Sequence, residues 1–221
     1  MDTTTPEVSP ASPDRDVSCD VLIVGAGASG TLLAAQLARQ TPPPRVLVLD
    51  GDQSAGRGAA YRTACTDHLL NVPARGMTAL ANEPQHFHRW LTQRLPGASD
   101  GTFASRSLYG DYLHALLVEA CARGSTTLRA GHAVAADRTE SSSGRPQWRV
   151  RLQGSALINA AQVVLAWGNF TPAPPPGCES LAGPLAGTVF INDPWRSDLA
   201  EGLADGAGQS QPVLMLGSGL T

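Results

Sequence analysis

The sequence predicts an α/β fold, in which helices cover a parallel sheet that continues into an antiparallel meander. Two short apolar runs, residues 20–24 and 45–49, flank a glycine-rich turn and a helical segment. A later region, residues 127–152, alternates between apolar and polar side chains, which is typical of antiparallel strands. A further apolar run, residues 162–166, leads into a proline-rich stretch. Strands that alternate with helices favour a parallel sheet in the N-terminal part.

The composition is typical of a globular protein, and it favours neither nucleic acid nor membrane as a partner. The chain has 221 residues, of which 42% are hydrophobic and 16% charged, and its net charge is -3. That length can bury a sizeable core, and no basic excess is present for nucleic acid. No apolar run approaches the roughly 20 residues that a membrane span needs.

The basic residues exclude several catalytic mechanisms. All 16 are Arg, so the chain has no Lys. A Walker-type phosphate site, a Schiff-base lysine and the Tyr-Lys pair of short-chain dehydrogenases are therefore excluded.

Cysteine and histidine spacing predicts no metal site. Cys19, Cys65, Cys121 and Cys178 lie far apart, without a C-x-x-C pair. The histidines also lack partners at ligand spacing.

Residues 1–17 are polar and proline-rich without an apolar stretch, which predicts a disordered lead-in and no signal peptide. We therefore expect a cytoplasmic protein with reduced thiols.

The N-terminal elements fit a dinucleotide-binding motif. A strand over Asp20–Val24 enters Gly25-Ala-Gly27-Ala-Ser-Gly30, and residues 31–40 follow as a helix. Gly25 allows a tight turn, Gly27 lets the backbone approach a pyrophosphate, and Gly30 lets helix and strand pack closely.

The ends of the neighbouring elements complete this predicted site. The helix N-terminus near Ala28 and Ser29 offers free N–H groups and a partial positive charge. The second strand, residues 45–49, is closed by Asp50, whose carboxylate can accept hydrogen bonds from ribose hydroxyls. The alternative is that the glycines only form turns and that Asp50 is an exposed acid at the end of a strand.

The middle of the chain favours FAD over NAD alone. A long polar loop, residues 51–81, precedes two predicted helices. Asn82 is expected to cap the first helix, and the second is expected to start near Ser107 with an apolar stripe. Residues 127–137 and 147–152 then predict two strands joined by a turn at 141–146. A plain NAD domain does not end in such a meander.

The last predicted strand supports the same conclusion by resemblance. It runs into Ala166-Trp167-Gly168 and a proline-rich exit. This order resembles the Rossmann-like FAD-binding domain of two-dinucleotide-binding flavoproteins, whose final strand enters an A-T-G-like turn. Trp167 departs from that pattern, whereas Gly168, which allows close approach to the flavin, is kept.

Longer segments resemble a particular family. The segments GRGAAYRTACTDHLLNVPARGMTAL (56–80), PQHFHRWL (84–91), RSLYGDYL (106–113) and INDPWR (191–196) occur in that order. They resemble the FAD/NAD(P)-binding family that includes bacterial urate hydroxylase and aspartate N-monooxygenase-like proteins. The resemblance implies an FAD-dependent oxidoreductase that uses NAD(P)H, and in particular a monooxygenase. The chain is also similar in plan to ornithine N-hydroxylases but lacks their loop Lys, so that substrate is not transferred.

The same resemblance implies further cofactor contacts. Val134 would meet the adenine, and Ala166 and Gly168 would lie at the flavin. Residues expected along the flavin are Gly58, Tyr61, His68, Asn71, Val72 and Pro73. Glycines permit backbone contact with a flat ring, and Asn offers both a donor and an acceptor. For Tyr61 and His68, packing of a long loop is an equally open alternative.

The C-terminus repeats the opening motif. Val213-Leu-Met-Leu-Gly217-Ser-Gly219 matches Val21-Leu-Ile-Val-Gly25-Ala-Gly27. It predicts the truncated start of a second Rossmann domain, which would bind NAD(P)H. The expected organisation is a lead-in over 1–17, an FAD-binding domain over 18–178, and a linker with the first strand and turn of the second domain over 179–221.

Without its helix, the second motif cannot hold a pyrophosphate. We therefore expect the isolated chain to be poorly soluble, to bind FAD weakly at most, and to be inactive with NADPH. The alternatives are a non-catalytic fragment, a disulfide-type flavin reductase, which would need a Cys pair near the first motif, and a single-nucleotide NAD dehydrogenase. No catalytic side chain is predicted, because the flavin carries the chemistry.

Overall fold

The structure is a computed structural model that describes residues 17–51, 55–170, 173–174, 176–177 and 193. The chain divides into two units, residues 1–168 and 169–221. All helices and strands of the described residues belong to the first unit. The predicted lead-in, the second glycine motif with Gly217 and Gly219, and the predicted boundary at 178/179 lie outside the described residues. None of the described helices is both long enough and apolar enough to span a bilayer.

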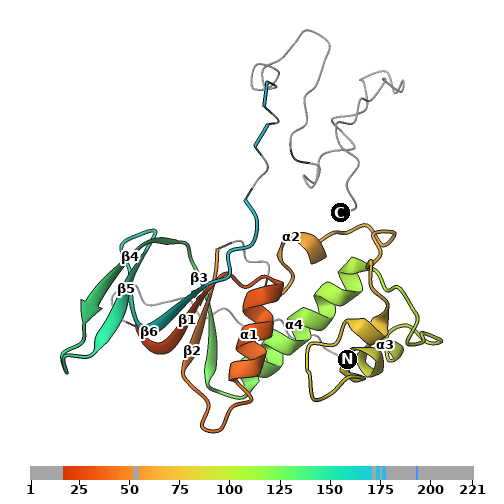
Figure 1. The fold of residues 1–221 in the computed structure, drawn as a ribbon, viewed down its shortest axis with the longest axis horizontal. Coiled ribbons are helices and arrows are strands. Elements are labelled where there is room, and N and C mark those ends of the chain that lie inside the picture. Colours follow the sequence, from red (N-terminus) through yellow and green to blue (C-terminus); the bar gives the residue numbers. More distant parts are fainter. Residues whose placement is uncertain (1–16, 52–54, 171–172, 175, 178–192, 194–221) are drawn as a thin grey trace. The chain divides into compact units, whose positions relative to one another are not determined.

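A six-stranded mixed sheet forms the centre of the first unit, and its strands lie in the order β3-β2-β1-β6-β5-β4 (Figure 1). The strands are β1 (Val17–Val24), β2 (Val46–Asp50), β3 (Thr126–Ala130), β4 (Ala133–Glu140), β5 (Pro146–Leu152) and β6 (Leu157–Leu165). Strands β3, β2, β1 and β6 are parallel, whereas β5 and β4 continue the sheet as antiparallel strands. The predicted fold class, a parallel sheet with an antiparallel meander, is confirmed.

Helices cover one face of the parallel strands. The helical elements are α1 (Ala28–Leu37), α2 (Gly58–Tyr61), the short 3-10 helix η1 (Ala74–Gly76), α3 (His86–Thr92) and α4 (Arg106–Ala122). Figure 1 shows α1 and α4 side by side on the same side of β1 and β2. The core between them includes Ile23, Val48, Ala34 and Leu117. The small side chains of α1 let it pack closely on both the sheet and α4.

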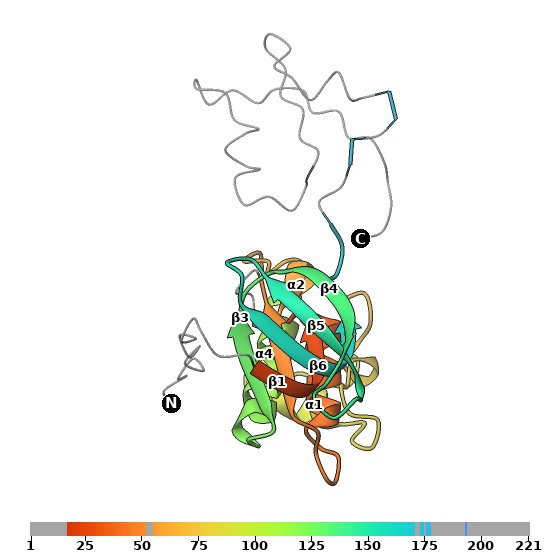
Figure 2. The same ribbon diagram turned by 90° about the vertical axis from the view of Figure 1, so that its left-hand side faces the viewer.

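The meander curves over the opposite face of the parallel strands, as Figure 2 shows. Leu22 and Leu49 pack there against Val150 and Ile158. Cys19 belongs to this cluster and is 7% exposed. Burial, the largest cause, raises the pKa of its thiol to about 11, so Cys19 stays protonated at neutral pH.

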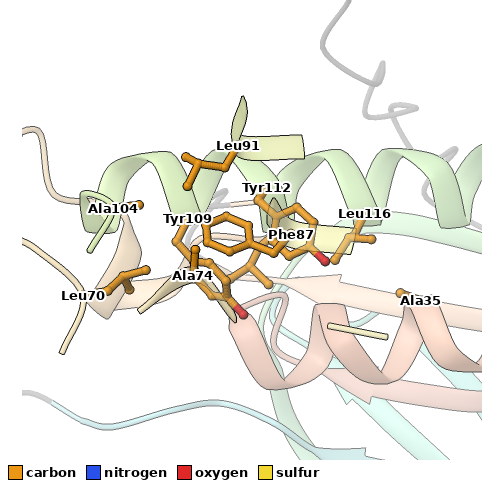
Figure 3. Close-up of a cluster of buried hydrophobic side chains, with 10 residues drawn as sticks. Ala35, Leu70, Ala74, Phe87, Leu91, Ala104, Tyr109, Tyr112 and Leu116 are labelled. Atoms are coloured by element: carbon orange, nitrogen blue, oxygen red, sulfur yellow. The ribbon is translucent and has the colours of Figure 1, made fainter. Parts of the chain in front are cut away.

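An aromatic cluster joins α3 to α4 (Figure 3). The ring of Phe87 lies 4.9 Å from that of Tyr112 and 5.1 Å from that of Tyr109, measured between centroids. Leu70 and Ala74, from the long segment before α3, are buried in the same cluster. Residues of this segment therefore belong to the hydrophobic core, and the segment contains α2 and η1, where the sequence predicts only a polar loop.

The first predicted helix starts later than expected. α3 begins at His86 with Gln85 as its N-cap, and no side chain caps it. Asn82 is therefore not the cap. The hydroxyl of Thr78 donates to the carbonyl of Glu83 at 2.9 Å, and this bond holds the preceding residues in a turn. α4 starts close to its predicted position and is capped by Ser105, whose hydroxyl accepts from the N–H of Leu108.

Two strand predictions were also wrong in detail. Residues 127–137 do not form one strand, because Gly131 has φ +151° and the chain turns there from β3 to β4. The run 162–166, expected as a buried strand, forms the end of β6 up to Leu165, but Leu165 is 56% exposed. β5 pairs only with residues 157–160 of β6, so the rest of β6 has β1 as its one described neighbour.

Replacing Phe87 by Ala should reduce the free energy of unfolding by about 3–5 kcal/mol. The side chain is 0% exposed and touches two further aromatic rings, so its removal leaves a cavity between α3 and α4. Urea denaturation followed by circular dichroism measures the change. Phe103→Ala is the matched control, because Phe103 is 49% exposed and its loss should cost far less. Equal losses for the two variants would contradict the described packing.

Candidate dinucleotide-binding site

Gly25 and Gly30 are required by the packing of the protein itself. A Cβ on Gly30 would collide with the carbonyl of Gly25, and a Cβ on Gly25 would collide with the carbonyl of Ala166. Gly25 also has φ +110°, a conformation that favours glycine. Ala166 donates its N–H to the carbonyl of Val24 at 2.8 Å. The end of β1, the start of α1 and the end of β6 therefore meet without intervening side chains.

Gly27 is different, because the described residues do not require a glycine there. A Cβ on Gly27 would meet only the Cα of Gly58, at an ordinary contact distance of 3.6 Å. Its φ of -70° is open to any residue. No collision within the described residues therefore explains the glycine at this position, whereas the close approach of a pyrophosphate to the backbone would require it.

Gly58 packs directly against Gly27. It has φ +62°, and a Cβ on it would lie 3.1 Å from the Cα of Gly27. The loop that carries Gly58 is fixed to the glycine motif by a hydrogen bond from the N–H of Gly56 to the carbonyl of Ala26, at 2.8 Å. Two glycines from distant parts of the sequence thus face each other at the start of α1.

The start of α1 suits an anion. Gly27 is the N-cap, no side chain caps the helix, and its first turn holds no acidic residue. Ala28 is half-buried and Ser29 is exposed. The hydroxyl of Thr31 donates to the carbonyl of Ala26 and so leaves the helix N–H groups to another acceptor. These groups and the helix dipole favour a phosphate at this point.

Asp50 lies at the end of β2, as predicted, but it is buried. Its side chain is 4% exposed, and Oδ2 accepts the N–H of Ala55 at 2.7 Å. This bond closes the loop after β2. A carboxylate has further lone pairs, so the predicted ribose contact is compatible with this bond and stays a prediction.

Tyr61 packs against α4. Its ring centroid lies 4.9 Å from that of Tyr109. Its carbonyl approaches Gly110 so closely that any side chain on Gly110 would collide with it. Arg57, at the start of α2, binds Asp111 through Nη2 and Oδ1 at 2.7 Å. Packing therefore accounts for the side chain of Tyr61, and its contact with a flavin stays a prediction.

The segment with His68, Asn71, Val72 and Pro73 is held by its backbone. The N–H of Leu70 donates to Ala104, and the N–H of Arg106 donates to His68, at 2.9 and 2.7 Å. The side chains of His68, Asn71 and Val72 are exposed, and Pro73 is half-buried. His68 also contacts the hydroxyl of Thr63 through Nδ1 at 2.9 Å. The segment thus presents its polar and apolar side chains outward on a fixed backbone.

The remaining predicted residues lie at two strand ends. Val134 is at a register shift between Ala133 and Ala135 and is 58% exposed. Gly168, with φ +73°, ends the first unit two residues after Ala166. Val134 is therefore open to a ligand, as its predicted adenine contact requires.

Gly56 and Gly110 shape the loop beside the candidate site, and the sequence prediction missed both. A Cβ on Gly56, which has φ +93°, would lie 2.9 Å from the Cα of His114 on α4. Both glycines let the loop before Tyr61 lie directly on α4. The sequence signal for these two residues was the glycine in the loop and the glycine in the segment YGDY. No rule of residue spacing identifies which residues such glycines contact. The described residues contain no group of three side chains that could hold a metal ion.

Comparison with known proteins identifies the kind of domain. The family described as FAD-NAD(P)-binding matches residues 22–170. None of the curated proteins matches the chain.

Several solved structures are similar to the chain. A flavin-containing monooxygenase from Stenotrophomonas maltophilia has 22% identity over 71% of this chain and 42% of that chain, with a TM-score of 0.49. A steroid monooxygenase bound to NADP has 18% identity over 71% and 28%, with a TM-score of 0.49. The chain spans less than half the length of these structures.

Gly30→Ala should destabilise the fold, whereas Gly27→Ala should not. The new methyl group at 30 meets the carbonyl of Gly25, and the resulting shift should cost about 3 kcal/mol. At position 27 the methyl group has room, and the cost should stay below about 1 kcal/mol. Urea unfolding of both variants without ligand measures the difference. A Gly27→Ala variant as unstable as Gly30→Ala would contradict the distinction between the two glycines.

Proposed function

The chain belongs to the FAD-NAD(P)-binding family, and from that membership we propose that it is the FAD-binding part of an NAD(P)H-using flavin oxidoreductase. The proposed reaction is the monooxygenation of a small polar molecule. The segments 56–80, 84–91, 106–113 and 191–196 support this narrower proposal, because they resemble the family of bacterial urate hydroxylase and aspartate N-monooxygenase-like proteins.

The observation that carries the proposal is the glycine at position 27, which no collision within the described residues requires. Gly25 and Gly30 are explained by collisions within the protein, but Gly27 is not. A glycine without an internal reason, at an uncapped helix start, fits a ligand that brings negative charge against the backbone. The pyrophosphate of FAD has that chemistry. The described residues therefore fit the cofactor.

The other parts of FAD would follow the neighbouring elements. The adenosine would lie toward Asp50 and Val134, at the ends of β2 and the start of β4. The flavin would lie along Gly58 and the segment 68–73, which α4 supports. When bound, FAD supplies hydride acceptance and oxygen activation. The chain contributes a fixed backbone and a surface that excludes water from one side of the ring.

The aromatic cluster of α3 and α4 explains how the segment 68–73, along which the flavin is proposed to lie, can be exposed and still have a fixed backbone. Leu70 is 4% exposed and Ala74 is 1% exposed, and both are packed among the rings of α3 and α4. The residues between them point outward. A segment anchored at both ends in this way positions its outward side chains without their own contacts to the core.

The organisation of the whole protein is part of the proposal. We propose an FAD-binding domain over 18–178 and the start of an NAD(P)H-binding domain at the motif with Gly217 and Gly219. The proposed partner is a small-molecule substrate, and the proposed compartment is the cytoplasm.

A disulfide-type flavin reductase is a weaker explanation. Its chemistry needs a reactive pair of thiols near the cofactor. Cys19 is buried in the sheet, with its pKa raised, and burial also raises the pKa of Cys121. Neither side chain belongs to the site described above.

Gly27→Ala should lower the affinity for FAD by about tenfold or more, because the methyl group occupies the space of the pyrophosphate. Titration of FAD fluorescence in the longest chain that contains these 221 residues measures the affinity. Gly101→Ala is the matched control, since a Cβ there would meet only the side chains of Ser99 and Arg75, both at ordinary contact distances. A wild-type protein that binds no FAD would sink the proposed function. Unchanged affinity in Gly27→Ala would sink the proposed phosphate site.

Oxidation of NAD(P)H should distinguish an enzyme from a binding protein. With FAD and O2, the longest chain that contains these residues should consume NAD(P)H, which the decrease in absorbance at the nicotinamide band measures. No consumption by that chain would favour a non-catalytic binding protein over an enzyme.

A further inference from the structure

The connection between β3 and β4 lies directly beside the end of β2. Ala130, the last residue of β3, is opposite Asp50 in the parallel register. The N–H of Gly131 then donates to the carbonyl of Asp50 at 3.1 Å. His132 follows, and Ala133 begins β4. The connection therefore passes the residue that is predicted to bind the ribose.

The imidazole ring of His132 lies on the backbone of Gly51. A Cβ on Gly51 would lie 2.6 Å from Nδ1 and 2.7 Å from Cε1 of this ring. Any side chain at position 51 would therefore displace the imidazole. The absence of a side chain there places the ring directly next to the residue that follows Asp50.

His132 is also exposed to solvent, as is Val134 two residues later. Both residues are exposed, whereas Ala133 between them is half-buried and packs into the core under the meander. The His132 ring makes no hydrogen bond to another described side chain. Nδ1 and Cε1 of the ring therefore lie close to Gly51, while His132 as a whole is exposed.

We propose that His132 contacts the adenosine part of FAD. The inference rests on the proposed function, because it assumes that FAD is bound with its adenosine at the end of β2. A flat ring supported from behind by backbone can stack against a base, and such stacking contributes substantially to nucleotide affinity. Asp50, His132 and Val134 then form one continuous contact for the sugar and the base.

The contact separates two parts of the cofactor. His132 lies at the adenosine end, whereas His68 lies on the segment predicted to follow the flavin. ADP, which shares the adenosine and the diphosphate with FAD but lacks the flavin, is therefore a specific probe. It should interact with His132 and leave His68 unaffected.

Affinity measurements test the proposal first. In the longest chain that contains these residues, His132→Ala should weaken the binding of both FAD and ADP by about tenfold. His132→Phe should recover most of that loss, because it keeps a flat ring. Gln153→Ala is the matched control: its side chain is exposed, and its backbone N–H to the carbonyl of His132, at 2.8 Å, is kept. Thermal melting checks that each variant is folded.

Chemical labelling tests direct contact, which a merely structural role of His132 would not produce. Diethyl pyrocarbonate modifies exposed histidines, and mass spectrometry of peptides gives the rate at each one. ADP should slow the labelling of His132 and not that of His68. Labelling of His132 at the same rate with and without saturating ADP would overturn the proposal.

The outcomes separate this inference from the proposed function. If the wild-type protein binds FAD and ADP, and His132→Ala binds both equally well, the inference is wrong and the proposed function stands. If the wild-type protein binds neither, both are wrong. Loss of FAD and ADP affinity in His132→Ala, with recovery in His132→Phe, would support the contact.

Discussion

The structure depends on the close meeting of three backbone segments at Gly25. The carbonyl of this residue lies against Gly30 of α1, and its Cα lies against the end of β6 at Ala166. No side chain separates the three segments. The direction in which α1 leaves the sheet, and the position at which β6 ends beside it, are therefore set by one residue. The helix start can face the edge of the sheet only because this contact is so short.

A second set of glycines positions the loop after β2 beside this contact at Gly25. Gly56 and Gly110 let the loop lie on α4 without side chains between them, and Gly58 brings it opposite Gly27. The loop after β2 is thus held in place by contact with α4, a helix that follows later in the sequence. Its stability comes from α4 and the aromatic cluster, while its outer side remains free for a ligand. This division separates folding from binding within a single segment.

Much of the fold was predictable, because the strongest signals were local. The strand over 20–24, the glycine motif and the strand ending at Asp50 appear close to where the sequence pattern places them. The start of α3 was missed because Thr78 holds residues before it in a turn, a contact between residues outside any helix pattern. Gly131 divides a continuous alternating run, since each half pairs with a different strand.

For the candidate site, the sequence identified the residues but not the contacts that require each of them. Gly25, Gly27 and Gly30 belong to one motif, yet only the structure shows that collisions within the protein require the glycines at 25 and 30 and not the one at 27. The interaction of Asp50 with Ala55 was likewise invisible, because the loop that joins them follows no periodic pattern. Tyr61 was left between two explanations, and its ring contact with Tyr109 supports packing.

The place of β1 in the middle of the sheet has a consequence for synthesis of the chain. β1 is made first, but its neighbour β6 lies far along the sequence: Cys19 and Asn159, which the two strands bring together, are separated by 140 residues. At a translation rate of roughly 5–20 residues per second, one edge of β1 stays unpaired for about 7–30 s before β6 is made. During that interval an apolar strand is open to other nascent chains, so the ribosome and its associated chaperones must protect the strand that later lies deepest in the sheet.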